Sequence, residues 1–132
     1  MKHFSINELT ASSTAKARKI SNTPTPGIEQ NLTALVNRVL DPLREAYGKP
    51  IRVNSGYRSP ELNKAVGGAK NSHHVLGMAA DITGGSKAEN RKLFNLIQEL
   101  NLPFTQLIDE KNFSWLHISY DPNNLKKQIL KL

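Results

Sequence analysis

Two histidines and an aspartate are the residues of this chain whose types and spacing could do metal chemistry. His74 and Asp81 lie in one segment, Ser-His-His-Val-Leu-Gly-Met-Ala-Ala-Asp, and His117 lies in Ser-Trp-Leu-His-Ile-Ser-Tyr near the C-terminus. Two imidazoles and one carboxylate leave a coordination position open on zinc, which distinguishes catalytic from structural zinc sites. The chain has no cysteine, so a closed thiolate site is excluded. The pattern therefore predicts a catalytic zinc site.

A loop and a strand are expected to deliver the first two of these residues. His74 and Asp81 are seven residues apart, which in a helix would separate them by two turns. The spacing fits instead a loop that carries His74 and a strand over 77–83 that carries Asp81. Gly77 and Ala79 lie between them and are small, which would let a metal and a substrate approach closely.

His117 is expected to project from the middle of a strand over 114–120. Its neighbours Leu116 and Ile118 are apolar and should face the core. On a two-residue period, His117 then faces the opposite side of the sheet together with Trp115 and Ser119. That is the side on which a metal ligand should lie.

Other roles stay open for these residues when each is taken alone. His73 is adjacent to His74 and could bind the metal instead, whereas His3 has no such context and is expected at the surface. His74 could be a surface histidine, Asp81 an ordinary aspartate at a strand end, and His117 a half-buried histidine bonded to the backbone.

The order of these residues resembles that of a known enzyme family. The pattern Ser-x-His-x-x-Gly-x-Ala-x-Asp over 72–81, followed by Trp-x-His-x-Ser over 115–119, is similar to the zinc D-alanyl-D-alanine carboxypeptidase family, which includes L-alanyl-D-glutamate endopeptidases of phage lysins. The segment Ser-Gly-Tyr-Arg-Ser over 55–59 with Asn63 resembles the same family, and residues 4–15 resemble its compact branch. The resemblance implies zinc-dependent hydrolysis of a peptide bond in peptidoglycan stem peptides. Its register favours His74 over His73 as the ligand.

The general base is the residue that departs from the family pattern. Relatives commonly carry an acid three residues before the final histidine, but this chain has Ser114 there, which cannot take a proton from water. The resemblance of Gln-Leu-Ile-x-Glu over 106–110 to the compact branch favours Glu110. Asp109 is the alternative, since adjacent strand residues point to opposite faces. Both acids could also serve only to solubilise a turn.

Arg58 and Ser72 are the expected substrate-binding residues. The resemblance implies that Arg58 binds a substrate carboxylate or stabilises the oxyanion, a role that suits the bidentate guanidinium. Ser72 could bind a substrate carboxylate or carbonyl, or it could cap its own loop, and the sequence leaves both possibilities open. Arg58 could instead be a surface arginine.

Composition predicts one domain over 1–132 with no membrane-spanning segment. The net charge of +7 is spread over scattered residues with no basic run of five, so a nucleic-acid partner is not expected. We expect a monomer whose partner is the stem peptide. Without an apolar signal region, it should be made in the cytoplasm and act on the cell wall after release, as a phage lysin does.

Patterns along the chain predict an α+β fold, with a small, largely antiparallel sheet flanked by helices. Capping boxes begin at Ser5 and Ser86, and Thr25 precedes a helix over 28–47 that Pro42 should kink or break. A short helix is expected over 60–66. Strands are expected over 50–55 and 77–83, and a strand pair over 104–109 and 114–120.

Two other functions fit the same residues. The chain could be a non-catalytic module that holds wall peptides or metal on this fold, a possibility that Ser114 keeps open. Two histidines and a carboxylate also form the facial triad of non-haem iron oxygenases, although the seven-residue gap and the upstream arginine argue against that class.

Overall fold

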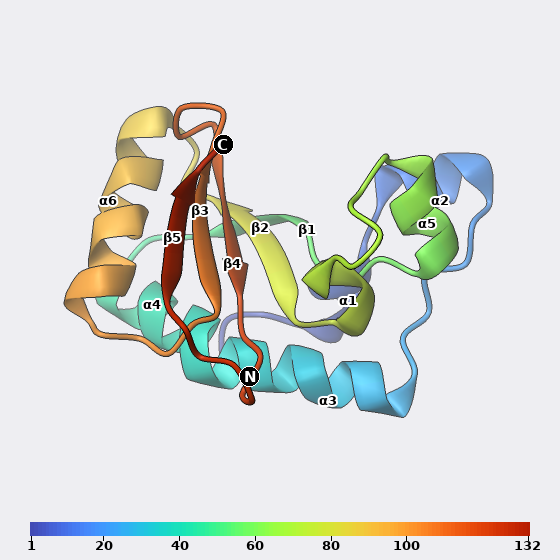
Figure 1. The fold of residues 1–132 in the computed structure, drawn as a ribbon, viewed down its shortest axis with the longest axis horizontal. Coiled ribbons are helices and arrows are strands. Elements are labelled where there is room, and N and C mark those ends of the chain that lie inside the picture. The colour runs from blue at the N-terminus through green and yellow to red at the C-terminus, as the bar shows by residue number, and fades with distance from the viewer.

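A five-stranded sheet with the order β1-β2-β4-β3-β5 forms the centre of the computed structural model, which describes residues 1–132 (Figure 1). All neighbouring strands are antiparallel except β3 and β5, which run parallel. The expected α+β class with a largely antiparallel sheet is confirmed. The strands are β1 (Arg52–Ser55), β2 (Ala79–Thr83), β3 (Gln106–Glu110), β4 (Trp115–Ser119) and β5 (Gln128–Lys131).

The helices lie around this sheet. In Figure 1, α6 stands beside β5 and β3, α3 and α4 run below the sheet, and α2 and α5 lie at the far end, beyond β1. No helix combines the length and the apolar character that crossing a membrane requires. The helices are α1 (Ile6–Thr10), α2 (Ser13–Arg18), α3 (Pro26–Leu35), the π-helical η1 (Val36–Leu40), α4 (Asp41–Tyr47), α5 (Pro60–Ala65), the 3-10 turn η2 (His73–Leu76) and α6 (Lys87–Glu99).

Side-chain caps begin four of these eight helices at the positions described next. The hydroxyl oxygens of Ser5, Thr25, Ser59 and Ser86 each accept a hydrogen bond from the backbone N–H three residues later. Such a bond satisfies one of the N–H groups that a helix leaves unpaired at its start. The local sequence therefore fixes where α1, α3, α5 and α6 begin.

Pro42 distorts the long helical stretch in a specific way. The predicted helix over 28–47 is one stretch over 26–47, but its turn before Pro42 widens into the π-helical η1, in which the Asp41 N–H bonds to Val36 O, five residues back. A proline inside an α-helix has no N–H to donate, and its ring collides with the carbonyl four residues earlier. A π-turn relieves both problems without ending the helix.

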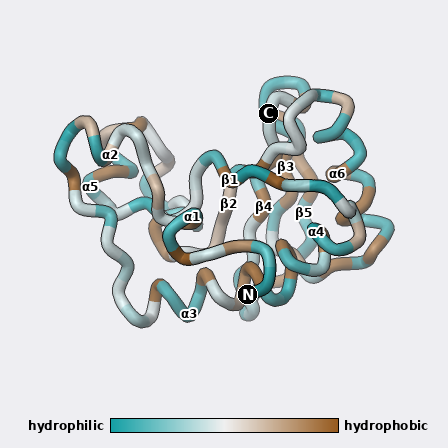
Figure 2. The backbone as a smooth tube through the Cα atoms, turned by 180° about the vertical axis from the view of Figure 1, so that it is seen from behind, coloured by the Kyte–Doolittle hydropathy of each residue, from teal (hydrophilic) through white to brown (hydrophobic).

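The sheet is buried on one face and carries the polar residues of interest on the other. Leu116, Ile118, Ala80 and Ile82 are fully buried in the core shared with the helices. Figure 2 shows hydrophobic and hydrophilic segments alternating along α3, as a helix with one buried side requires. Leu100, which follows the last residue of α6, is 39% exposed and does not continue the buried side of that helix.

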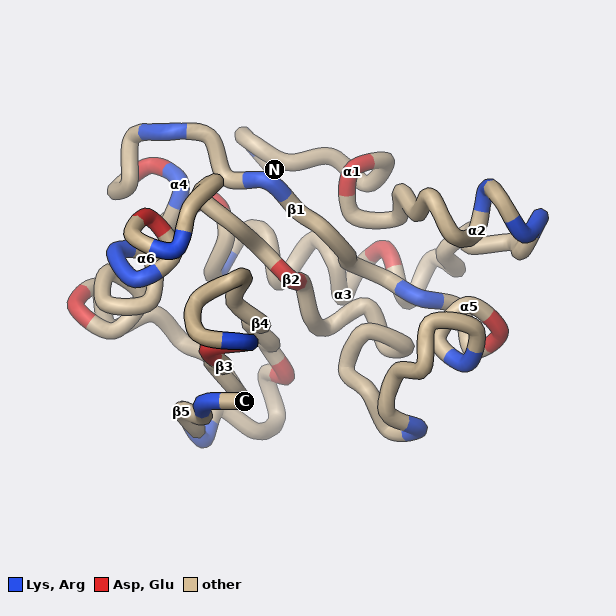
Figure 3. The backbone as a smooth tube through the Cα atoms, turned by 90° about the horizontal axis from the view of Figure 1, so that it is seen from above, with Lys and Arg blue, Asp and Glu red and all other residues tan.

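Strand β5 was not predicted from the sequence. It is short, mostly exposed, and pairs in parallel with β3 at the edge of the sheet, with Leu107 opposite Ile129. Its Lys131 and neighbouring lysines suit an edge strand, where charge discourages pairing with another molecule. Lysine and arginine residues are otherwise spread over several elements, including α2, α5 and α6, and do not gather on one continuous face (Figure 3).

Candidate metal centre and active site

The register of β2 and β4 brings Asp81 and His117 together. The two residues are direct partners across the antiparallel pair, and both project from the face opposite the core. Asp81 Oδ1 lies 3.3 Å from His117 Nδ1. A separation of 36 residues in the chain is thereby reduced to one cross-strand contact, the closest arrangement that a sheet offers to two side chains.

His74 reaches the same point from the η2 turn. Its Nε2 lies 3.3 Å from Asp81 Oδ1, and its Nδ1 lies 2.7 Å from Gly56 O. The ring is almost fully buried, and one possible ligand atom each from His74, Asp81 and His117 lies within 4.8 Å of the others. The structure therefore brings together the three residues that the sequence singled out, and His73 is not part of the group.

The protonation of His74 indicates that this cluster suits a cation. Gly56 O can only accept a hydrogen bond, so Nδ1 of His74 carries the proton and, in the neutral ring, Nε2 presents its lone pair to Asp81. Burial acts to raise the pKa of Asp81, but hydrogen bonding from His117, and from the His74 ring when that ring is protonated, outweighs it and holds the pKa well below its usual value. An ionised carboxylate facing an imidazole lone pair needs a positive charge between them, and a nitrogen and oxygen donor set with no sulfur fits zinc.

Gly77 has a different role from the expected one. Its φ of 72° closes the η2 turn, and a side chain there would come within 2.9 Å of Ile28 Cγ2. Neither Gly77 nor the fully buried Ala79 lines the cleft above the donor cluster. Their small size therefore serves packing against α3 and within the sheet, not the approach of a metal or substrate.

An open cleft of about 570 Å³ lies over the three donors. Its walls come from the loop between α5 and η2, from β3 and from the start of β4. Gln106, Ile108 and Glu110 line it from alternate positions of β3, and Trp115 lines it from β4. The volume lies within the range of about 300–1,000 Å³ that is usual for small-ligand sites.

Strand parity separates the two candidate bases. Glu110 lines the cleft, whereas Asp109 faces the other side, is 4% exposed and accepts a hydrogen bond from the Phe113 N–H. The carboxylate of Asp109 is therefore used within the fold. Only Glu110 offers a carboxylate from this strand to a substrate near the donors.

The turn between β3 and β4 has an unusual backbone. Lys111, Asn112 and Phe113 adopt consecutive φ values of 48°, 54° and 62°, a left-handed region that side chains disfavour. The turn is anchored by Phe113, which is buried and packs edge-to-face on Phe94 at 5.4 Å between ring centroids. Ser114 donates its hydroxyl to Lys111 O and does not line the cleft. The position at which relatives carry an acid is thus part of this turn.

Arg58 is held by three protein acceptors. Nε donates to Ser55 Oγ at 3.0 Å, Nη1 to Asn63 Oδ1 at 3.2 Å and Nη2 to Asp81 Oδ2 at 3.3 Å. Its side chain is 16% exposed and lines the cleft. The sequence predicted an arginine directed at substrate; the structure adds a direct contact with one of the three candidate ligands.

Ser72 caps the η2 turn, one of the two roles left open by the sequence. Its Oγ accepts a hydrogen bond from the His74 N–H at 3.1 Å. The residue also lines the cleft, so its hydroxyl can still donate to a bound group. The cap fixes the backbone at His74, which makes Ser72 a support for that residue as well.

Asn63 and Gly68 support Arg58 in a way that the sequence did not reveal. The Asn63 side chain is buried, accepts from Arg58 and donates to Ala69 O at 2.9 Å. A side chain on Gly68 would lie 2.0 Å from Asn63 Oδ1 and 2.8 Å from Arg58 Nη1. The pair of adjacent glycines after α5 pointed only to a helix end, and nothing local indicated this close packing.

Comparison with known proteins agrees with this geometry. A model of the family Peptidase M15 matches residues 2–119, a range that contains the donor cluster and Glu110. A zinc D-Ala-D-Ala carboxypeptidase of Streptomyces albus G is 53% identical over 49 residues, or 36% of this chain. The matched segment spans 19% of the length of that relative, so the similarity covers about a fifth of it.

Proposed function

The chain belongs to the peptidase M15 family, and we propose that it is a zinc metallopeptidase that hydrolyses a peptide bond in peptidoglycan stem peptides. The family match confirms the resemblance expected from the two sequence motifs. Zinc is the metal in the name of the Streptomyces albus G relative, and it suits the donor set of this chain. The relative's name also supports a substrate from peptidoglycan, in which D-Ala-D-Ala is a terminal dipeptide.

We assign zinc binding to His74, Asp81 and His117. When bound, zinc supplies Lewis acidity that polarises a carbonyl and lowers the pKa of water. Gly56 O fixes the ring and tautomer of His74, and Arg58 fixes the second oxygen of Asp81. Such supporting contacts orient metal ligands and raise their affinity for the metal.

Glu110 is the residue that we assign to proton transfer. It takes a proton from the attacking water and returns it to the leaving amine, so that both proton transfers take place within the cleft. Arg58 orients the substrate or stabilises the developing oxyanion with N–H groups that remain free after its three protein contacts. Ser72 can donate its hydroxyl to a substrate carboxylate or carbonyl.

The observation that carries this proposal is the convergence of the three donors on the floor of a cleft with an uncommitted carboxylate, Glu110, in its wall. A non-catalytic module would need the donors but not Glu110. An iron oxygenase with a facial triad would not be expected to match a peptidase family or to place Arg58 beside a metal ligand.

Mass spectrometry of digested sacculi tests the proposal. Purified walls of known composition are incubated with the zinc-loaded protein, with protein stripped by a chelator, and with stripped protein to which zinc is restored. We expect new peptide termini only where zinc is present, and their masses identify the bond, either D-Ala-D-Ala or L-Ala-D-Glu. Binding to sacculi without new termini would favour the non-catalytic module, and iron in the protein purified without added metal would favour an oxygenase.

Action on the cell wall after release, as in a phage lysin, is part of the proposal. This part of the proposal rests only on the proposed substrate class, peptidoglycan stem peptides. A lytic assay on intact cells, with protein added from outside or expressed inside together with a membrane-permeabilising agent, distinguishes the two routes to the wall.

A further inference from the structure

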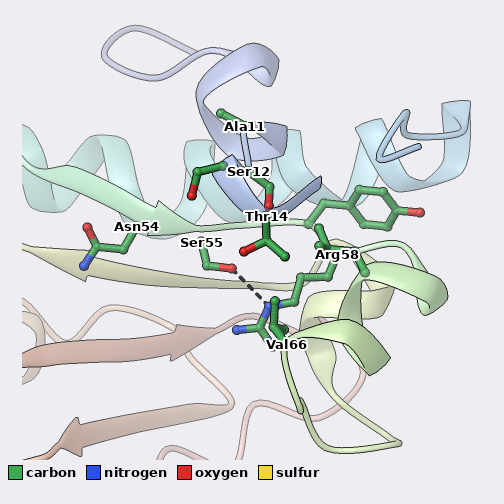
Figure 4. A pocket seen from close by; sticks show the side chains of 10 residues that line it. Ala11, Ser12, Thr14, Asn54, Ser55, Arg58 and Val66 are labelled. Atoms are coloured by element: carbon green, nitrogen blue, oxygen red, sulfur yellow. Dashed lines mark hydrogen bonds between the residues drawn. The ribbon is translucent and has the colours of Figure 1, made fainter. Parts of the chain in front are cut away.

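A second, smaller cavity lies next to the catalytic cleft, with Arg58 in the wall of both (Figure 4). Its volume is about 210 Å³. The connection between α1 and α2 forms one side, and the end of β1 and helix α5 form the others. Figure 4 shows Thr14, Ser55 and Arg58 directed into the same space, with Val66 beside the guanidinium. Val66, like Arg58, lines the cleft as well.

The walls of this cavity are tied together by hydrogen bonds that sequence analysis did not identify. Asn22 donates from Nδ2 to Thr10 O at 2.8 Å and to Tyr57 O at 3.0 Å. The Tyr57 N–H donates to Leu9 O at 2.7 Å. The end of α1 and the segment that carries Arg58 are therefore bonded to each other directly. The cavity does not depend on a ligand to hold these two segments together.

The chemistry of the lining favours a negatively charged group. Arg58 is its one charged residue, and hydroxyl or amide groups come from Ser12, Thr14, Asn54 and Ser55. The hydrogen bond drawn among the lining residues in Figure 4 is the one from Arg58 Nε to Ser55 Oγ. The Thr14 hydroxyl is in no such bond and faces Arg58, so it can bond to a ligand, whereas the Asn54 side chain points away from Arg58.

The guanidinium of Arg58 retains donors for such a group. It has five N–H bonds. The contacts with Ser55, Asn63 and Asp81 use one each from Nε, Nη1 and Nη2, so one N–H on each terminal nitrogen is free. Two N–H donors of a guanidinium suit a carboxylate, and hydrogen bonds of this charge-assisted type are stronger than those to a neutral amide.

We propose that this cavity is a subsite for one carboxylate-bearing residue of the peptide substrate, next to the residues that lie over the metal centre. The inference rests on the proposed function, since it assumes a peptide in the cleft. The cavity is smaller than the range of about 300–1,000 Å³ typical of whole small-ligand sites, so it accommodates a part of a ligand. In stem peptides the residue of this kind is a glutamate whose α-carboxyl is either free or a carboxamide.

Calorimetric titration with a matched peptide pair tests the inference. The two stem peptides differ only in that glutamate, which carries a free carboxyl in one and a carboxamide in the other. The zinc-loaded Glu110→Gln variant serves as the receptor, so that binding is measured without turnover. We expect the peptide with the free carboxyl to bind about tenfold or more tightly, as one charge-assisted hydrogen-bond pair allows. Equal affinities for the two peptides would overturn the inference.

Two substitutions on α2 locate the subsite. Thr14→Leu adds bulk to the cavity and should remove most of the preference for the free carboxyl. Ala17→Leu adds similar bulk at an exposed position of the same helix that does not line the cavity, and should retain the preference. Circular dichroism and zinc content check that both variants fold. A preference that survives Thr14→Leu would place the carboxylate elsewhere in the cleft and overturn the assignment to this cavity.

The sacculus digest separates failure of this inference from failure of the proposed function. If the peptides bind equally but new termini appear in digested walls, the peptidase activity stands and the subsite does not. If the free carboxyl is preferred but no bond is cut, the subsite stands on a protein that binds wall peptides without hydrolysis.

Discussion

Arg58 donates from Nη2 to Oδ2 of Asp81 over 3.3 Å, while the other oxygen of that carboxylate lies 3.3 Å from both His74 Nε2 and His117 Nδ1. One aspartate thus faces the candidate metal position with one oxygen and the candidate substrate-binding arginine with the other. A change at Arg58 should therefore reach the metal site as well as the substrate.

Arg58→Ala is expected to lower turnover strongly and to weaken zinc binding by about 10–100-fold without abolishing it, as loss of a supporting contact to a ligand typically does. Arg58→Lys should restore only part of the turnover and part of the zinc affinity, because lysine retains the charge but lacks the planar guanidinium that bonds several acceptors at once. Competition with a chromogenic chelator measures zinc affinity. Turnover on peptides with free and amidated C-termini shows whether the loss depends on a terminal carboxylate. Unchanged zinc affinity in Arg58→Ala would mean that the contact does not support Asp81.

Substitution of the three donors should separate them from their neighbour His73. We expect His74→Ala, Asp81→Asn and His117→Ala each to abolish zinc binding or reduce it strongly, since each removes one of three protein ligands. His73→Ala should retain zinc, because that side chain lies outside the donor cluster. Metal content after dialysis and competition with a chelator give the comparison. Loss of zinc in His73→Ala together with its retention in His74→Ala would show that the ligand assignment in this loop is wrong.

The two acids at the end of β3 form a matched pair. Glu110→Gln should retain zinc and lose on the order of 10²–10⁴-fold in turnover, the usual contribution of a general base. Asp109→Asn removes the same charge one residue away, but the amide oxygen can still accept from the Phe113 N–H, so it should retain most of the activity. Kinetics and zinc content of both variants check this. If the two losses were reversed, the base would be Asp109.

The part of this site that the sequence could predict is the part set by local periodicity. Alternation of Leu116 and Ile118 around His117 gave the face of β4, and the same two-residue period placed Glu110 and Asp109 on opposite sides of β3. Hydroxyl caps gave the starts of the helices for the same reason, since each cap bonds only three residues along the chain.

Contacts between distant segments could not be predicted in this way. The pairing of Asp81 with His117 depends on the register between two strands, and the bonds of Arg58 to Asn63 and Asp81 depend on how α5 and β2 meet. Strand β5 pairs with the edge of β3, which exists only once the sheet is assembled. The peptidase family resemblance supplied the choice of ligands, which periodicity alone left open.

Gly68→Ala tests whether close packing beside Arg58 matters to function. The added methyl group would lie 2.0 Å from Asn63 Oδ1, so either Asn63 or the loop after α5 must shift and the Asn63–Arg58 bond should be lost. We expect a clear loss of turnover with zinc retained, since the three donors are not displaced.

Gly67→Ala is not a clean control for Gly68→Ala, because Gly67 has a φ of 73° that alanine disfavours. Ala65→Ser, a small change at the end of α5, serves better. Full activity of Gly68→Ala would show that Arg58 does not need this support.

A carboxylate far from the cleft should govern part of the acid stability. Glu89 of α6 accepts from Lys49, from Tyr47 at 2.6 Å and from Lys92 at 2.9 Å, and these contacts, that of Lys49 above all, lower its pKa from 4.5 to about 2. Because the folded pKa is below the unfolded value, the unfolded chain binds more protons between them. The stabilisation is therefore present above pH 4.5 and lost as the pH falls toward 2.

In denaturant titrations of metal-free protein, wild type should be more stable than Glu89→Gln at pH 6, and the difference in stability should shrink steadily below pH 4.5. A difference that stays constant across this range would mean that the charge of Glu89 does not contribute to stability.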